Sequence, residues 1–304
     1  MIITNTKIRN IAIIAHVDHG KTTLVDGLFK QSGLMKNGSQ DRIMDSGAIE
    51  RERGITISAK NCAITWKGVK INIIDTPGHA DFSEDTYRGL SAVDSALMVV
   101  DSVKGVEERT RQLCVVCRMR ATPITTFVNK LDREGKDPME LLDEIERELA
   151  VEVRPVTWPI GQGKLFKGVY NLVEKKLLLF RPGEDQLPTD TFRIDSLDDP
   201  RLDERVGDSR ARQLREDVAM ITGIYPPFDR DEYMAGKVTP VFFGSALNNF
   251  GVRELLDSLV SLAPPPTPKE AEERLIKPEE QAFSGFVFKI HANMNPKHRD
   301  RIAF

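Results

Sequence analysis

The chain has 304 residues, with 43 Lys and Arg against 46 Asp and Glu, which gives a net charge of −3. This length is enough for one large domain or two with an ample core, and the charge excludes the strongly basic composition of proteins that bind naked nucleic acid. Three cysteines form no disulfide framework, the N-terminus carries no signal pattern and no apolar run is long enough to span a membrane. We therefore expect a soluble, cytoplasmic protein that does not enter a membrane.

The first motif is a loop between an apolar run at 10–15 and a helical segment at 22–30. Backbone N–H groups at such a strand-to-helix junction point at anions, and the helix dipole favours negative charge. Gly20 allows close backbone approach, Lys21 supplies a positive charge for the β- and γ-phosphates, and the hydroxyl of Thr22 suits Mg²⁺. The predicted phosphate-binding residues are Ala15, His16, Val17, Asp18, His19, Gly20, Lys21, Thr22 and Thr23.

The second motif, Asp75-Thr76-Pro77-Gly78-His79, follows the apolar run at 71–75. A carboxylate at the C-terminal end of a buried parallel strand lies where open α/β sheets place their ligands, so Asp75 is predicted to hold the Mg²⁺ shell through water. The N–H of Gly78 is available for a γ-phosphate. Thr56, in the charged stretch between the two motifs, is predicted to close on Mg²⁺ and to be released after hydrolysis.

The third motif, Asn129-Lys130-Leu131-Asp132, comes after the apolar run at 124–128 and indicates which base is bound. An aspartate accepts two hydrogen bonds from N1–H and the exocyclic amine of guanine, whereas adenine has no donors in that arrangement. The stem of Lys130 can cover the base. Ser245-Ala246-Leu247, after the run at 241–243, is placed to offer a backbone N–H to the guanine oxygen. Three motifs in this order predict a site for GTP and GDP.

Apolar runs near 10–15, 71–75, 96–101, 124–128 and 240–244 alternate with helical segments, which predicts an α/β fold with a doubly wound, mostly parallel sheet of the P-loop GTPase type. A hairpin over 61–75 that turns at Lys67-Gly68 would add one antiparallel edge strand. Pro138 is predicted to open a helix with apolar residues at helical spacing. Cys114 and Cys117 lie in a helical context, which favours core packing over metal or redox chemistry.

The spacing between Asp132 and Ser245 is too long for the one helix and one strand that the sheet needs there. We therefore predict a GTP-binding domain over 1–153 and 227–264, with an inserted α+β subdomain over 154–226. A Pro-rich and acidic linker covers 265–282. Residues 283–304 are expected to start a β-barrel domain, with strands at 285–290 and 301–304, and the chain is expected to be a fragment or to lack its later domains.

The whole chain resembles translational GTPases, the class that includes elongation factor G. Residues about 1–81 are similar to BipA/TypA through the stretches 10–26 and 51–57. Residues about 82–304 resemble bacterial peptide chain release factor 3 through the stretches 82–88, 137–144, 163–170 and 296–301. Release factor 3 usually carries Pro and Ala where this chain has Val17 and His19.

The resemblance implies a ribosome-activated GTPase of translation termination that drives a class I peptide chain release factor off the ribosome. It implies that His79 and Lys21 are catalytic, that ribosomal RNA positions His79, and that Asp18 helps to hold a monovalent cation. We expect a monomer with the ribosome and a class I release factor as partners. A BipA/TypA-like or elongation factor G-like GTPase, a GTP-binding ribosome-assembly module and a non-functional hybrid remain alternatives.

Overall fold

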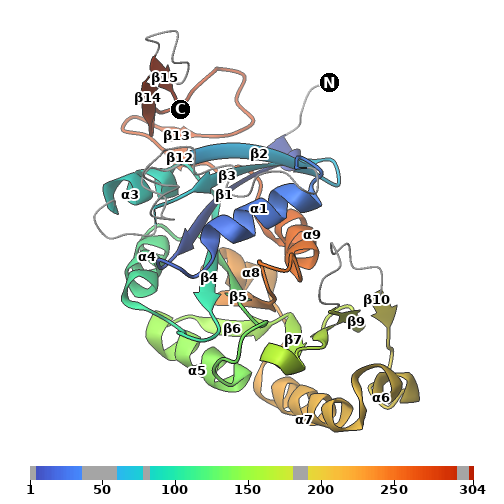
Figure 1. The fold of residues 1–304 in the computed structure, drawn as a ribbon. Coiled ribbons are helices and arrows are strands. Elements are labelled where there is room, and N and C mark those ends of the chain that lie inside the picture. Colours follow the sequence, from blue (N-terminus) through green and yellow to red (C-terminus); the bar gives the residue numbers. More distant parts are fainter. Residues whose placement is uncertain (1–4, 36–59, 78–82, 181–190, 293–300) are drawn as a thin grey trace.

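The computed structural model describes residues 5–35, 60–77, 83–180, 191–292 and 301–304, and Figure 1 shows their arrangement. Its centre is a seven-stranded sheet with the order β2-β3-β1-β4-β5-β11-β6. The neighbours pair in parallel, except that β2 runs antiparallel to β3 at one edge. The strands of this sheet are β1 (Ile8–Ala15), β2 (Lys60–Trp66), β3 (Val69–Asp75), β4 (Ser95–Asp101), β5 (Ile124–Asn129), β6 (Glu152–Pro155) and β11 (Val238–Phe243). The predicted doubly wound, mostly parallel sheet and its antiparallel edge hairpin are confirmed.

Alternating residues of the central strands pack against two separate hydrophobic clusters, one on each face of the sheet. In β1, Ile11 and Ile13 belong to one cluster, and Ala12 and Ile14 belong to the other. A strand that is buried on both faces reads as a continuous apolar run, which is why these strands were recognisable in the sequence.

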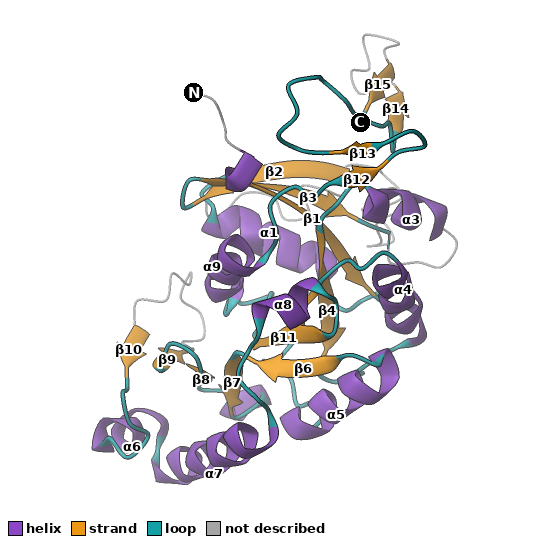
Figure 2. Ribbon diagram, turned by 180° about the vertical axis from the view of Figure 1, so that it is seen from behind, coloured by secondary structure: helices purple, strands orange, loops and turns teal. Residues whose placement is uncertain are grey.

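Helices cover both faces (Figures 1 and 2). One cluster includes side chains of α1 (Lys21–Gln31) and α9 (Val252–Leu262), and the other includes side chains of α3 (Ser83–Ser91), α4 (Glu108–Met119) and α5 (Pro138–Leu149). Helix α5 begins where predicted, because Pro138 occupies its first turn and the Asp137 side chain caps it by accepting from the N–H of Met139 over 2.8 Å. Among the helices of the described ranges, none has the length and apolar character needed to cross a membrane.

Between β6 and β11 lies a four-stranded antiparallel sheet with the order β10-β9-β8-β7, followed by helices. Trp158 joins this sheet to the helices, since its Nε1 donates to Asp217 over 2.9 Å, and it packs edge-on against Phe243 of β11 at 5.5 Å. The insertion therefore shares one hydrophobic cluster with the main sheet. Its elements are β7 (Thr157–Ile160), β8 (Gly168–Asn171), β9 (Lys176–Leu179), β10 (Thr191–Arg193), α6 (Pro200–Val206) and α7 (Asp208–Ile224), with α8 (Arg230–Met234) after them.

Two details differ from the sequence-based expectations. Strand β6 pairs with β11 as the last strand of the main sheet, so the predicted subdomain boundary at 153/154 cuts through a strand. The strand expected over 285–290 was placed wrongly, because β14 spans Ile290–Ala292 and only Ile290 is common to both. Phe283, Phe286 and Val287 are exposed, so the described residues do not cover the apolar side chains of this segment.

The remaining short elements are η1 (Asn5–Lys7), η3 (Gly163–Leu165), β12 (Lys269–Glu270), β13 (Leu275–Ile276) and β15 (Arg301–Ala303).

Candidate nucleotide-binding site

The predicted phosphate-binding loop connects the C-terminal end of β1 to the first turn of α1. Gly20 immediately precedes the helix with a φ of 91°, in the left-handed region. A Cβ atom at this position would lie 2.3 Å from Nδ2 of Asn129, so only glycine fits. The loop thus presents the N-terminus of α1 at the edge of the sheet where the parallel strands end, as the sequence predicted.

Lys21, the first residue of α1, and Asp75, the last residue of β3, form an ion pair at this edge of the sheet. The Lys21 side chain is nearly buried and the Asp75 carboxylate is completely buried, at the end of β3 beside β1. Thr22, the next residue of α1, is half-buried. A carboxylate and a hydroxyl are the hard oxygen ligands that Mg²⁺ prefers, so this donor set fits a magnesium ion bound together with phosphates. Thr23 is half-buried on the same turn, while Thr76 binds the Ile13 carbonyl with its hydroxyl over 2.7 Å and Pro77 is buried.

Asn129 joins the three predicted loops. Its Nδ2 donates to the His19 carbonyl over 2.9 Å, and its Oδ1 accepts from the N–H of Lys130 and of Ala246, each over 2.8 Å. All of these contacts are buried or nearly so, and the contacts with His19 and Ala246 bridge residues more than a hundred positions apart. The amide of Asn129 therefore holds the phosphate-binding loop, the 129–132 loop and the 245–247 loop in one fixed arrangement.

The predicted base-recognition residues lie together at this junction. The hydroxyl of Ser245 donates to Oδ1 of Asp132. The Lys130 side chain crosses toward the phosphate-binding loop, where its Nζ donates to the Asp18 carbonyl. Leu131 is buried beneath the loop and Leu247 is exposed beside it. The acceptor of Asp132 and the backbone after Ser245 are thus within one loop cluster.

Two acidic residues at this site were not identified from the sequence. Asp101 ends β4 and accepts from Nζ of Lys130 over 2.6 Å. Burial opposes ionisation, but hydrogen bonds from Lys130 and from the N–H of Val103 outweigh it and hold the pKa of Asp101 below its ordinary value. The rule that selected Asp75, a carboxylate at the end of a buried parallel strand, would also have selected Asp101.

Glu107 is the second, and it supports the phosphate-binding loop from below. The buried ring of His19 lies with Nδ1 at 3.2 Å from the Val99 carbonyl and Nε2 at 2.7 Å from Oε2 of Glu107. Burial opposes ionisation of Glu107, but the hydrogen bond with His19 and the nearby charge of His16 hold its pKa below the ordinary value. The side chain of His19 therefore packs beneath the loop and holds Glu107, and the half-buried His16 lies against the same carboxylate at 3.7 Å.

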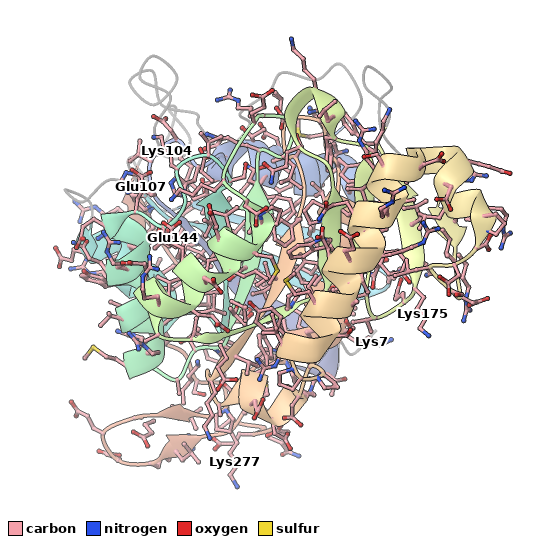
Figure 3. The ribbon with its side chains drawn as sticks, turned by 90° about the horizontal axis from the view of Figure 1, so that it is seen from below. Lys7, Lys104, Glu107, Glu144, Lys175 and Lys277 are labelled. Atoms are coloured by element: carbon pink, nitrogen blue, oxygen red, sulfur yellow. The ribbon has the colours of Figure 1, made fainter. Side chains whose placement is uncertain are left out.

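The loop that carries Glu107 is itself braced by α5. Oε1 of Glu144 accepts from the N–H of Val106 over 3.0 Å, and Oε2 accepts from Nζ of Lys136 over 2.6 Å. Figure 3 shows Lys104, Glu107 and Glu144 on the same side of the molecule. No signal in the sequence marks this support, because it depends on how α5 packs.

Cys114 and Cys117 are buried in the hydrophobic cluster under α4, in agreement with the expected core role. Burial raises the pKa of the Cys117 thiol to about 12. Within the described ranges, no group of three or more His, Cys, Asp or Glu side chains could hold a metal ion. Thr56, Gly78 and His79, which were predicted to complete the site, lie outside the described residues.

Comparison with known proteins identifies the family of this chain. The family described as "Elongation factor Tu GTP binding domain" matches residues 6–265. A crystal structure of a Thermus thermophilus protein superimposes with a TM-score of 0.69 at 22% sequence identity, over 86% of this chain and 41% of that chain. This identity shows the fold alone, and the chain spans less than half the length of that relative. The family match covers most of the sequence and implies GTP and GDP binding with Mg²⁺, and GTP hydrolysis. The chain belongs to the elongation factor Tu GTP-binding domain family of translational GTPases.

Proposed function

We propose that this chain is a ribosome-activated GTPase of translation termination that promotes the release of class I release factors. The observation that carries the nucleotide site is Asn129, whose amide joins the phosphate-binding loop to both base-recognition loops. The role in termination rests on the resemblance of 82–304 to release factor 3. One of the resembling stretches, 163–170, docks on the base-recognition loop, where the N–H of Gly163 donates to the Leu131 carbonyl over 2.9 Å.

Each predicted site residue then has a stated task. The loop from Ala15 to Thr23 holds the phosphates with its backbone N–H groups, and Lys21 neutralises the charge of the β- and γ-phosphates. Thr22, Thr56 and Asp75 would hold Mg²⁺, which would offset the negative charge of the phosphate oxygens. Thr76, Pro77 and Gly78 approach the γ-phosphate. Asn129, Lys130, Leu131 and Asp132, with Ser245, Ala246 and Leu247, enclose the guanine.

Lys21 is the group whose partner changes in this scheme. Its ammonium pairs with the Asp75 carboxylate in the structure. The phosphates of GTP offer a larger negative charge at the same strand edge, so we expect Lys21 to exchange Asp75 for the phosphates. Asp75 would then be available to hold Mg²⁺. The exposed carboxylate of Asp18 is the proposed contact for a monovalent cation.

Hydrolysis is phosphoryl transfer to water, so catalysis consists mainly of positioning and charge stabilisation. His79 follows the Asp75-to-Gly78 motif in the sequence, and its proposed task is to orient the attacking water when ribosomal RNA positions it. Slow hydrolysis in solution and fast hydrolysis on the ribosome follow from this division of labour. The protein acts as a monomer in the cytoplasm under this proposal.

The first experiment measures GTP hydrolysis by this chain with and without bacterial ribosomes. We expect stimulation by roughly a hundredfold or more, and its loss in His79→Ala with GDP binding retained. Normal GDP binding without stimulation would argue against ribosomal activation of this chain. Loss of GDP binding in His79→Ala would argue against a role limited to water positioning.

A second measurement tests termination itself. Ribosomes stalled at a stop codon with a fluorescent class I release factor should lose that factor when the chain and GTP are added. Stimulated hydrolysis without factor release would instead favour a BipA/TypA-like or elongation factor G-like role. The similarity of 10–26 and 51–57 to BipA/TypA is the observation that favours the BipA/TypA-like role as a second candidate. Ribosome binding without stimulated hydrolysis would favour a GTP-binding assembly module.

A further inference from the structure

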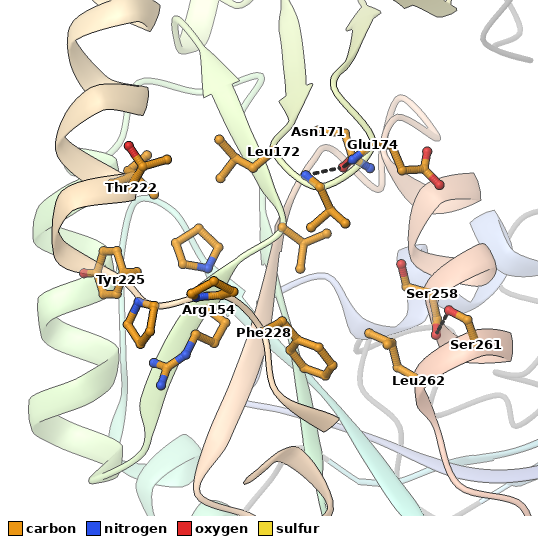
Figure 4. A pocket seen from close by; sticks show the side chains of 16 residues that line it. Arg154, Asn171, Leu172, Glu174, Thr222, Tyr225, Phe228, Ser258, Ser261 and Leu262 are labelled. Carbon is orange, nitrogen blue, oxygen red and sulfur yellow. Dashed lines mark hydrogen bonds between the residues drawn. The ribbon is translucent and has the colours of Figure 1, made fainter. Parts of the chain in front are cut away.

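A cavity of about 560 Å³ lies where the inserted segment meets β6 and α9, and none of the predicted nucleotide-site residues lines it. Figure 4 shows its walls, which come from the β6–β7 connection, the β8–β9 turn and the C-terminal ends of α7 and α9. The walls are mostly apolar, with Val156, Ile221, Tyr225, Phe228 and Leu262 among them. This volume falls within the range of small-molecule sites, which combine apolar walls with few fixed polar groups.

Asn171 supplies a fixed polar group on this wall. Its Oδ1 accepts from the N–H of Val173 over 3.0 Å and of Glu174 over 2.8 Å. Because those backbone groups only donate, they determine which end of the amide is the oxygen. The Nδ2 donor is therefore fixed as well; it has no hydrogen-bond partner among the described residues, and Asn171 as a whole is 5% exposed.

The charges on the wall are already compensated. The Arg154 side chain is 5% exposed, and its Nη2 pairs with Glu152 at 2.7 Å and with Glu232 at 3.4 Å. Glu174 pairs with Lys176 at 2.9 Å. The Nε of Arg154 is a buried donor that lacks a partner in the described part of the chain. The wall thus has donors without acceptors but no uncompensated positive charge to attract an anion.

We propose that this cavity binds a neutral small molecule with an apolar ring and a carbonyl group, the carbonyl accepting a hydrogen bond from Nδ2 of Asn171. The ring would fill the space between Tyr225, Phe228 and Leu262. This site is independent of GTP binding and goes beyond the proposed function. An occupant would bridge the inserted segment and α9, since both contribute wall residues.

The test is a calorimetric and ligand-detected NMR titration of the full chain with two probes of matched size. Acetanilide carries the neutral carbonyl, and phenylacetate carries a carboxylate instead. We expect acetanilide to bind with a dissociation constant on the order of millimolar, as its small size allows, and roughly tenfold more tightly than phenylacetate. No saturable binding of acetanilide, or tighter binding of phenylacetate, would overturn the proposal.

Two variants locate the binding. Asn171→Asp keeps acceptors for the N–H groups of Val173 and Glu174 but removes the Nδ2 donor, so acetanilide affinity should fall by about fivefold. Thr222→Trp places a bulky ring on the α7 wall and should abolish binding, whereas Met220→Trp, exposed on the same helix and outside the cavity, should not. GDP binding and the thermal midpoint confirm that each variant is folded. Binding that both cavity variants leave unchanged would place the probe elsewhere and refute the site.

Discussion

Nζ of Lys130 donates to Oδ2 of Asp101 over 2.6 Å, and the same ammonium donates to the Asp18 carbonyl. Asp101 is almost completely buried at the end of β4, where the N–H of Val103 also donates to it over 2.8 Å. Lys130 has a φ of 71°, so its backbone as well as its side chain is held in a specific conformation. Lys130, which follows β5, thus contacts the end of β4 and the loop after β1, and its stem is predicted to cover guanine.

Asp101→Asn should weaken GDP binding without unfolding the chain. The neutral amide cannot balance the positive charge of Lys130. Leaving the ammonium in a largely buried position without its carboxylate partner destabilises the site. We expect the dissociation constant for GDP to rise by roughly tenfold, which corresponds to about 1.4 kcal/mol. Fluorescent GDP titration measures this. Lys176→Met, which breaks the exposed pair with Glu174, is the control and should leave affinity unchanged.

Gly20→Ala should abolish nucleotide binding. The new Cβ would lie 2.3 Å from Nδ2 of Asn129 and would also strain a φ of 91°. Gly33→Ala is the matched control, since Gly33 has a φ of 76° but open space around its Cβ position. We expect the control to lose about 1 kcal/mol of stability with GDP affinity intact, and Gly20→Ala to lose binding by roughly a hundredfold. Equal effects on GDP affinity would show that the contact with Asn129 is unimportant.

Asp132→Asn should change the base preference of the site from guanine to xanthine, because the substitution replaces a carboxylate oxygen that accepts hydrogen bonds with an amide group that donates them. The hydroxyl of Ser245 can still donate to the remaining amide oxygen, so the loop should keep its shape. We expect GDP affinity to fall by roughly a hundredfold and xanthosine diphosphate to bind better than GDP. Asp137→Asn, which preserves the cap of α5, is the control. A competition assay in which guanine preference is unchanged would refute the assignment.

Glu254 predicts a pH dependence of stability. Burial, helped by the nearby carboxylates of Asp257 and Glu174, raises its pKa to about 7. The folded chain then binds more protons than the unfolded chain between pH 4.5 and about 7, so this group's contribution to stability falls as pH rises through that window. Glu254→Gln should be more stable than the parent chain by about 1 kcal/mol at pH 8 and nearly equal at pH 4.5. Urea unfolding at both pH values and at constant GDP concentration measures the free energy of unfolding. Glu216→Gln, at an exposed position, is the control, and its stability relative to the parent chain should be the same at both pH values.

Local sequence patterns determined the fold class and most elements of the main sheet. Continuous apolar runs identified the buried strands, because a parallel strand between two helical layers needs apolar residues on both faces. The turn at Lys67-Gly68 and the cap of α5 at Asp137-Pro138 were recognisable because turn and cap chemistry is local. The three nucleotide motifs were found for the same reason, since each consists of neighbouring residues at a strand end.

Only the tertiary structure decided what depends on pairing between distant segments. Strand β6 is short and carries charged residues at Glu152 and Arg154, so nothing local marks it, and it forms because β11 offers a free edge. The apolar alternation near 285–289 predicted a strand that begins only at Ile290, because alternation does not supply a partner strand or a covering layer. Likewise, the contacts of Asn129 with the His19 carbonyl, of Lys130 with Asp101 and of His19 with Glu107 join residues whose sequence separation carries no periodic signal. A motif indicates which groups a site needs, but the geometry of the site is set by the packing of the strands that carry them.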